Sequence, residues 1–168
     1  LTGERLWHFQ GVHHDVWDRD FPLPPALVDL TVDGERIPAL VQNSKQAFVY
    51  AFNRVTGEPI WPIEERPVPQ SDVPSEQTSP TQPYPTRPAA FEMQGLTEDD
   101  LIDFTPVLRS LALEIASEWR LGPMWNPPLH SENADGKKGA IFCPSAGGGA
   151  NIPGGGAMDP ETGIMYVA

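Results

Sequence analysis

The sequence has one cysteine, few basic side chains and no long apolar run. Lysine and arginine number 11 against 23 aspartates and glutamates, which gives a formal net charge of -12 at pH 7. Nucleic acids and anionic membrane surfaces bind basic footprints, so this charge argues against both as partners. The single cysteine, Cys143, excludes a disulfide within the chain. No apolar run approaches the ~20 residues of a membrane span, and none near the start is typical of a signal peptide.

Proline and glycine are abundant instead, with 20 and 15 of them in 168 residues. This content favours short strands, turns and ordered loops over a helical protein. The length suffices for one ordinary domain. The chain begins without methionine and ends inside a strand-like run. We therefore expect an internal piece of a longer protein, with compartment signals elsewhere.

One pattern occurs about one and a half times. Residues 51–61 read as a strand end, a polar Thr-Gly turn and a new strand closed by Trp61, and residues 1–7 repeat the tail of this pattern up to Trp7. The separation of the two tryptophans fits one propeller blade plus an insertion. Gly57 allows the positive φ of a tight turn, and a tryptophan can pack flat against the neighbouring unit. The pattern predicts an all-β fold, part of a β-propeller.

Four short strands are predicted between the two tryptophans, and four antiparallel strands make one blade. The Asp33-Gly34 pair is a strong hairpin signal between the first two. A further hairpin is expected to start at Asp159-Pro160. The predicted strands of the blade are 26–32, 37–42, 47–52 and 59–63.

The segment 62–138 is predicted to be a long Pro-rich loop and a helical insertion within the propeller domain of residues 1–168. Its first part, 62–88, holds eight prolines and no apolar periodicity, so we expect an extended loop. A helical region is predicted near 97–120, with Thr97 and Asp100 at capping-box spacing and a second helix over 105–119. A strand is expected at 139–143. Apolar residues at helical spacing predict the buried face of the second helix: Leu108, Leu111, Ala112, Ile115 and Trp119.

The segment from His13 to Asp20 has the densest functional groups: two imidazoles, three carboxylates and Trp17 within eight residues. Polar groups this dense on a connection between strands are typical of a site on a rigid scaffold. The alternative is a solvated acidic loop. A zinc site is disfavoured, because adjacent histidines in an extended segment point to opposite faces and no third ligand follows at ordinary spacing. We expect hydrogen-bonded loop histidines instead.

These residues resemble the eight-bladed quinoprotein dehydrogenases. Residues 51–61 are similar to the tryptophan-docking motif of that family, and residues 13–18 to its active-site H-x-D-x-W-D segment. The order of the later features also matches, most closely in the membrane-type glucose dehydrogenase branch. The resemblance covers essentially the whole chain and implies about two to three blades. Those later features are Lys45, the Thr-Pro-Thr-Gln-Pro-like run 79–83, Pro127-Pro128, the Gly-Gly-Ala-Asn run 148–151, and Asp159-Pro160.

The resemblance implies a cofactor and roles for three residues. The family uses pyrroloquinoline quinone (PQQ) with a divalent cation, Ca²⁺ or Mg²⁺. Asp18 matches the aspartate that acts as general base and lies beside the metal. Lys45 matches the lysine that contacts the quinone, and Asn151 matches an asparagine near the cofactor. The other metal ligands of the family come from earlier blades, outside these residues.

The implied function is oxidation of an aldose sugar or an alcohol by hydride transfer to PQQ. A quinone-type acceptor, a periplasmic location and membrane attachment through segments outside this chain are further implications. Asp18 would take the hydroxyl proton, and Lys45 would stabilise the reduced cofactor. Trp17 is expected to pack in the wall of the site. Two alternatives are a non-catalytic propeller scaffold for protein partners, which has no need of both Asp18 and Lys45, and a metal-dependent hydrolase, which lacks further ligands.

Overall fold

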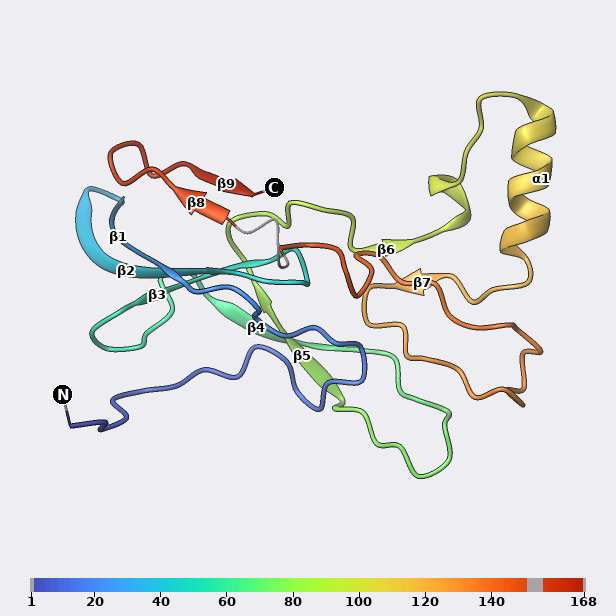
Figure 1. Cartoon of the computed structure of the whole chain (residues 1–168), viewed down its shortest axis with the longest axis horizontal. Coiled ribbons are helices and arrows are strands. Elements are labelled where there is room, and N and C mark those ends of the chain that lie inside the picture. The colour runs from blue at the N-terminus through green and yellow to red at the C-terminus, as the bar shows by residue number, and fades with distance from the viewer. Residues whose placement is uncertain (1, 151–155, 168) are drawn as a thin grey trace.

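A three-stranded antiparallel sheet forms the centre of the molecule. The computed structural model describes residues 2–150 and 156–167. The sheet consists of β1 (Ala26–Val32), β2 (Glu35–Asn43) and β3 (Val49–Asn53), paired in the order β1-β2-β3 (Figure 1). Val32 pairs with Glu35 around Asp33 and Gly34, whose φ angles are 51° and 85°. Two left-handed residues give the hairpin turn that matches strand twist, so the Asp-Gly prediction is confirmed.

Strand β3 is buried on both faces. Because side chains alternate along a strand, Val49 and Ala51 face one apolar cluster, and Tyr50 and Phe52 face another. The second cluster also contains the tryptophans of two loops. Its buried members are Trp17, Phe48, Tyr50, Phe52, Val68, Met124 and Trp125. The sheet therefore lies between two packed layers, and one of these layers carries the His13–Asp20 loop.

The fourth predicted strand, 59–63, is wrong. Only Pro59 pairs with the sheet, through an isolated bridge to Phe52. The chain then leaves the sheet as β4 (Ile63–Pro67), which pairs with β5 (Thr81–Pro85). The prediction of an extended loop over 62–88 is therefore also wrong in part. A two-stranded ladder leaves one edge of each strand unpaired, so prolines that lack an N–H are tolerated there.

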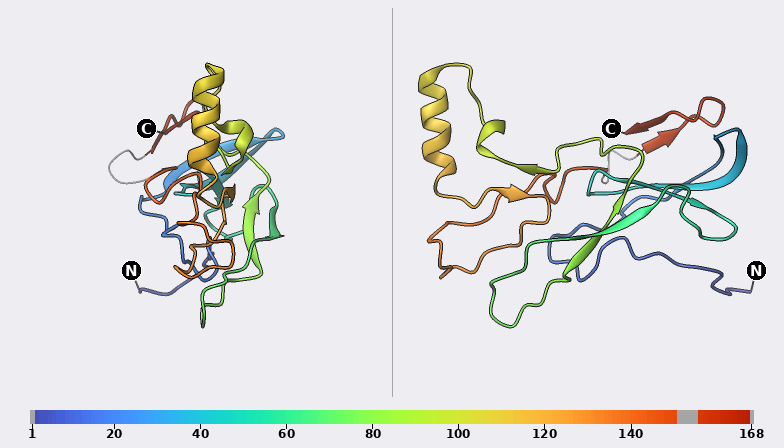
Figure 2. Two further views of the ribbon diagram at one scale, coloured as in Figure 1. Left: turned by 90° about the vertical axis from the view of Figure 1, so that its right-hand side faces the viewer. Right: turned by 180° about the vertical axis from the view of Figure 1, so that it is seen from behind.

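The helical insertion closely follows its prediction. Strand β6 (Gly95–Leu96) pairs with β7 (Gly122–Pro123), and between them lie η1 (Glu98–Asp100) and α1 (Pro106–Ala116). The capping box at Thr97 is present, and Thr105 caps α1 by accepting a hydrogen bond from the Leu108 N–H at 3.2 Å. Helix α1 stands at the end of the molecule away from the β1–β2 turn (Figures 1 and 2). No helix in the described ranges is both long and apolar enough to cross a bilayer.

The predicted buried face of α1 is wrong in large part within the described structure, because Leu108, Leu111 and Ile115 are exposed while only Ala112 and Trp119 are half-buried. Leu111 is 49% exposed and Ile115 54% exposed, and the nearby Phe104 and Val107 are more exposed still. The helix projects from the rest of the chain in both views of Figure 2. Amphipathic periodicity predicts which side of a helix is apolar, but it does not identify the surface that covers that side.

Two other strand predictions have different outcomes. Residues 139–143 form no strand, and their only pairing is an isolated bridge between Arg120 and Ala140. The hairpin at Asp159 is confirmed as β8 (Gly156–Met158) and β9 (Met165–Val167). Residues 2–10 run alongside the core without pairing as a strand, and Phe9 packs on Phe52 with ring centroids 4.8 Å apart.

Trp7 packs against Gly57, in keeping with the prediction that the tryptophan packs on a neighbouring unit and that Gly57 has a positive φ. The indole N–H of Trp7 donates to the Arg54 carbonyl at 3.1 Å. A Cβ placed on Gly57 would lie 2.6 Å from Cγ of Trp7, and the φ of Gly57 is 81°. The glycine therefore serves two purposes: it adopts the left-handed turn conformation and leaves room for the indole.

We expect Gly57→Ala to destabilise the fold more than Gly34→Ala does. Both glycines have nearly the same φ, 81° and 85°, but a Cβ on Gly34 meets nothing within 4 Å. The difference should be about 1 kcal/mol in the free energy of unfolding, because the half-buried Trp7 ring can shift. Denaturant unfolding of the two variants measures it. Equal losses would contradict the packing role of Trp7.

Candidate active site

The carboxylate of Asp15 shapes the loop that carries Asp18. Its oxygens accept the backbone N–H groups of Trp17 at 2.8 Å and Arg19 at 2.7 Å, one on each side of Asp18. Asp18 has φ 63°, a left-handed conformation that aspartate adopts more readily than most residues. The Asp18 side chain is 72% exposed as a result. The loop thus presents this carboxylate to the outside of the packed layer.

Lys45 lies in the tight turn between β2 and β3. Its ammonium nitrogen is 3.0 Å from Oδ2 of Asp18 and 2.5 Å from Oδ1 of Asp20, and its side chain is only 8% exposed. The hydrogen bond that Lys45 donates to Asp20 is the main cause that raises the pKa of Lys45, so the amine is charged at neutral pH. The structure therefore brings together Asp18 and Lys45, two of the three predicted site residues.

Asp20 was given no role from sequence, although its carboxylate holds Lys45 more closely than Asp18 does. No spacing rule predicts this contact, because Asp18 has φ 63° and the segment is not an extended strand. The left-handed backbone at Asp18 and the fold around Lys45 bring the two carboxylates to one ammonium.

Trp17 packs in the wall of this site, as predicted. Its side chain is buried, and its indole N–H donates to the Asn126 carbonyl at 2.9 Å. Trp17 meets Trp125 edge to face, with ring centroids 5.0 Å apart. The wall therefore joins the active-site loop to the segment that follows β7, and Trp125 is a member that sequence reasoning missed.

His13 is a hydrogen-bonded loop histidine, as predicted. Its Nε2 lies 2.9 Å from Oε1 of Glu65 in β4. Its backbone N–H donates to Oε1 of Gln82 at 2.8 Å, and Nε2 of Gln82 donates back to the His13 carbonyl at 2.6 Å. Across residues 2–150 and 156–167, no group of three or more His, Cys, Asp or Glu side chains is arranged to hold a metal ion. The β4–β5 hairpin thus anchors the active-site loop.

The glycine-rich segment approaches the turn of Lys45. The Ala150 N–H donates to the Ser44 carbonyl at 2.9 Å, and a Cβ on Gly149 would lie 2.4 Å from the Lys45 carbonyl oxygen. The backbone of Gly149 thus packs directly on the backbone of the lysine turn. Asn151, the third predicted site residue, lies outside the described residues.

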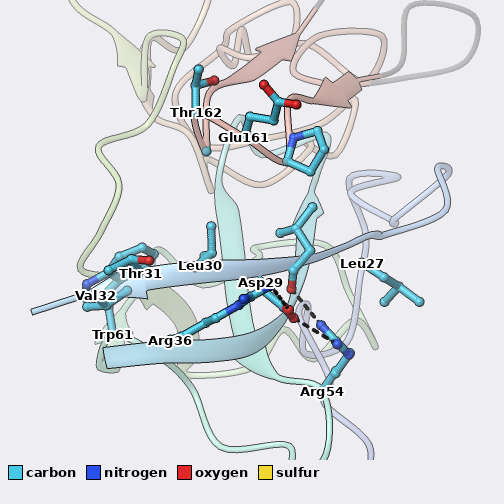
Figure 3. Close-up of a pocket in the computed structure, with 13 residues that line it drawn as sticks. Leu27, Asp29, Leu30, Thr31, Val32, Arg36, Arg54, Trp61, Glu161 and Thr162 are labelled. Carbon is cyan, nitrogen blue, oxygen red and sulfur yellow. Dashed lines mark hydrogen bonds and ion pairs between the residues drawn. The ribbon is translucent and has the colours of Figure 1, made fainter. Parts of the chain in front are cut away.

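A cleft between β1 and the β8–β9 hairpin lies apart from this site. Its lining includes Trp61, Glu161 and Thr162 (Figure 3). Asp29 is paired there with both Arg36 at 2.9 Å and Arg54 at 3.0 Å, so its carboxylate is already engaged by two guanidinium groups. Gly163 lies in a Thr-Gly turn like that of Gly57, but no tryptophan among the described residues packs on it. The nearest atom to a Cβ on Gly163 belongs to Leu30, not to Trp61.

Comparisons with known proteins show which proteins this chain resembles. A family model described as "PQQ: Glucose/ethanol/alcohol dehydrogenase, beta-propeller domain" matches residues 1–168. Quinate/shikimate dehydrogenase (quinone) of Acinetobacter baylyi is 33% identical over 167 residues, which is 99% of this chain and 20% of that protein. Quinoprotein glucose dehydrogenase of Gluconobacter oxydans is 47% identical over 79 residues, 46% of this chain and 10% of that protein.

The Escherichia coli quinoprotein glucose dehydrogenase is 42% identical over 69 residues, 41% of this chain and 9% of that protein. The chain thus spans at most about a fifth of the length of these relatives. No solved structure matches the chain significantly.

Proposed function

The chain belongs to the PQQ-dependent glucose/ethanol/alcohol dehydrogenase β-propeller family, and from this we propose that Asp18 and Lys45 serve an active site that oxidises an aldose sugar or an alcohol. The observation that carries the proposal is the contact between the Lys45 ammonium and the Asp18 carboxylate at 3.0 Å. Relatives named for glucose, quinate and glycerol favour a polyhydroxylated substrate.

The residues at the site fit PQQ. When bound, PQQ supplies a carbonyl carbon that accepts a hydride. Lys45 offers a charged donor on a nearly buried side chain, whose position is fixed by two carboxylates. We assign Lys45 to the quinone oxygen and Asn151 to the same cofactor.

A divalent cation, Ca²⁺ or Mg²⁺, belongs to the proposal as well. Such hard cations bind carboxylate oxygens, and the Asp18 side chain is exposed enough to provide one. The described residues supply no group of three candidate ligands. The remaining ligands are therefore assigned to segments outside this chain.

The proposed step begins with Asp18 accepting the hydroxyl proton of the substrate. To do so, the Asp18 carboxylate must turn from Lys45 toward the substrate. Asp20 keeps Lys45 neutralised during this change, because it holds the same ammonium at 2.5 Å. Lys45 therefore stays oriented, and its positive charge would stabilise negative charge on the quinone oxygen assigned to it.

We propose a quinone as the electron acceptor. The name of the Acinetobacter baylyi quinate/shikimate dehydrogenase includes the word quinone. A periplasmic location and membrane attachment through segments outside this chain stay part of the proposal. The competing function, a propeller scaffold for protein partners, makes no use of the buried ammonium at Lys45.

Reconstitution of the full-length protein tests the proposed function. PQQ and Ca²⁺ are added to the apoprotein, and dye-linked oxidation is followed with glucose, quinate and glycerol. We expect saturable PQQ binding and turnover of at least one of these compounds. A folded protein that binds no PQQ would exclude the dehydrogenase function and favour the scaffold.

We expect Lys45→Met to weaken PQQ binding by roughly tenfold to a hundredfold, since a charge-assisted hydrogen bond contributes about 1.5–3 kcal/mol. Lys138→Met is the control, because Lys138 is an exposed lysine that pairs with Glu118 on the surface. Fluorescence titration of apoprotein with PQQ measures both affinities. Equal affinities in the two variants would remove Lys45 from the cofactor site.

A further inference from the structure

Arg19 is a fully buried arginine beside the catalytic carboxylate, and the proposed chemistry gives it no task. Its residue surface is 0% exposed. Burial lowers the pKa of Arg19 to about 10, while the nearby Asp15 carboxylate acts in the opposite direction, so the guanidinium stays charged at neutral pH. A buried charge is costly to keep unless it is well hydrogen-bonded, so its partners indicate its purpose.

The partners of Arg19 are backbone carbonyls from three separate segments. One terminal nitrogen donates to the Lys45 carbonyl at 3.2 Å and to the Ser145 carbonyl at 3.4 Å. The other donates to the Met124 carbonyl at 3.4 Å and also to the carbonyl of Pro144. The guanidinium carbon lies 5.5 Å from the Phe142 ring centroid, within range of a cation–π contact.

The guanidinium of Arg19, with its donors spread like a fork, thus joins the turn of Lys45 to the loops that follow β7. The Lys45 carbonyl is also the group that Gly149 approaches, so the turn is held from two sides. Within the turn itself the backbone has few bonds of its own, among them Ser44 N–H to the Phe48 carbonyl at 3.1 Å and Ala47 N–H to the Ser44 carbonyl at 3.0 Å. The position of the Lys45 backbone therefore depends on long-range contacts.

We propose that Arg19 is a positioning residue, which fixes the Lys45 turn so that the ammonium stays between Asp18, Asp20 and the cofactor. The planar guanidinium suits this task because its donors reach several carbonyls at once, which one ammonium does not. The inference rests on the proposed function for its catalytic meaning. Its structural content, the immobilisation of Lys45 by Arg19, is independent of PQQ.

Lysine labelling of the full-length apoprotein tests that structural content. Arg19→Met is treated with acetic anhydride, and the acetylation rate of Lys45 is compared with that of exposed Lys138 by mass spectrometry. We expect the Lys45 rate, relative to Lys138, to rise roughly tenfold as the turn loosens. Tyr50→Phe is the control, since it removes a buried hydrogen bond to the Pro83 carbonyl without touching the turn. An unchanged Lys45 rate, or an equal rise in Tyr50→Phe, would overturn the inference.

Arg19→Lys covers the case in which Arg19→Met does not fold. It keeps the buried positive charge but loses the fork, so a smaller rise in Lys45 labelling is expected. If folded Arg19→Lys showed the wild-type acetylation rate of Lys45, the inference would be overturned as well.

A double-mutant cycle links Arg19 to the cofactor. Arg19→Met should lower PQQ affinity roughly tenfold to a hundredfold in the wild-type background, and much less when Lys45→Met is already present. A residue that acts through Lys45 gives this non-additive result, whereas a general loss of stability gives additive losses. Additive losses would overturn the positioning role, while absence of PQQ binding in the wild type would instead defeat the proposed function.

Discussion

Asp18→Asn is expected to abolish most of the dehydrogenase activity while leaving the protein folded. Removal of a general base typically lowers the rate by about 10²–10⁴-fold, so kcat of the full-length protein should fall in that range. Asparagine has nearly the same shape and also tolerates the φ of 63° at this position. Because the side chain is largely exposed, little packing is lost. Dye-linked turnover at saturating PQQ measures the effect.

Asp33→Asn is the matched control for that change. Asp33 also has a positive φ, 51°, but lies in the β1–β2 turn away from Lys45. The Asp33→Asn variant carries the same chemical substitution as Asp18→Asn, in the same type of backbone conformation. We expect wild-type kcat for Asp33→Asn, and unfolding midpoints near wild type for both variants. Wild-type kcat in Asp18→Asn would show that the base is another group.

Gly149→Ala is expected to lower the free energy of unfolding more than Gly57→Ala or Gly34→Ala does. Its Cβ would lie 2.4 Å from the Lys45 carbonyl oxygen and 2.7 Å from that of Ser44, and both belong to backbone that does not rotate away. Overpacking of this kind costs about 1–3 kcal/mol or more, in addition to the left-handed strain. The turn of Lys45 should also move, so PQQ affinity is expected to fall together with the unfolding free energy.

Gly136→Ala isolates the contribution of the clash. Gly136 has φ 64° against 60° for Gly149, yet a Cβ there meets nothing within 4 Å. Both variants therefore carry the same backbone strain, and only Gly149→Ala meets the Lys45 turn. Denaturant unfolding and PQQ titration compare them. If the two variants matched in both measurements, the glycine-rich segment would have no role in holding the turn.

The parts of the fold that were predictable are those set by neighbours in sequence. The Asp33-Gly34 hairpin, the capping box at Thr97 and the Thr-Gly turn at Gly57 each follow from a few adjacent residues. The β4–β5 hairpin was missed because its prolines mask the usual alternation. The exposed side of α1 was missed because periodicity does not identify a partner surface.

The site was predictable to a similar extent. The segment that carries Asp18 stands out by its density of functional groups, and the resemblance to quinoprotein dehydrogenases pointed to Lys45. The contacts of Asp15 are local and were missed, whereas those of Asp20 and Arg19 depend on the fold. The Arg19 carbonyl contacts join residues more than a hundred positions apart, at Met124 and Ser145. Local patterns carry no information about such pairs.

The two hydrogen bonds between Gln82 and the backbone of His13 have a consequence for local opening. Gln82 is fully buried, and both its amide atoms are used by the loop that carries Asp18. The loop and the β4–β5 ladder therefore open as one cooperative unit, and the His13 amide should exchange with deuterium at the same opening free energy as the ladder. The β4–β5 part of the Pro-rich insertion thus belongs to the unit that holds the Asp18 loop, and deleting it should leave that loop without its anchor.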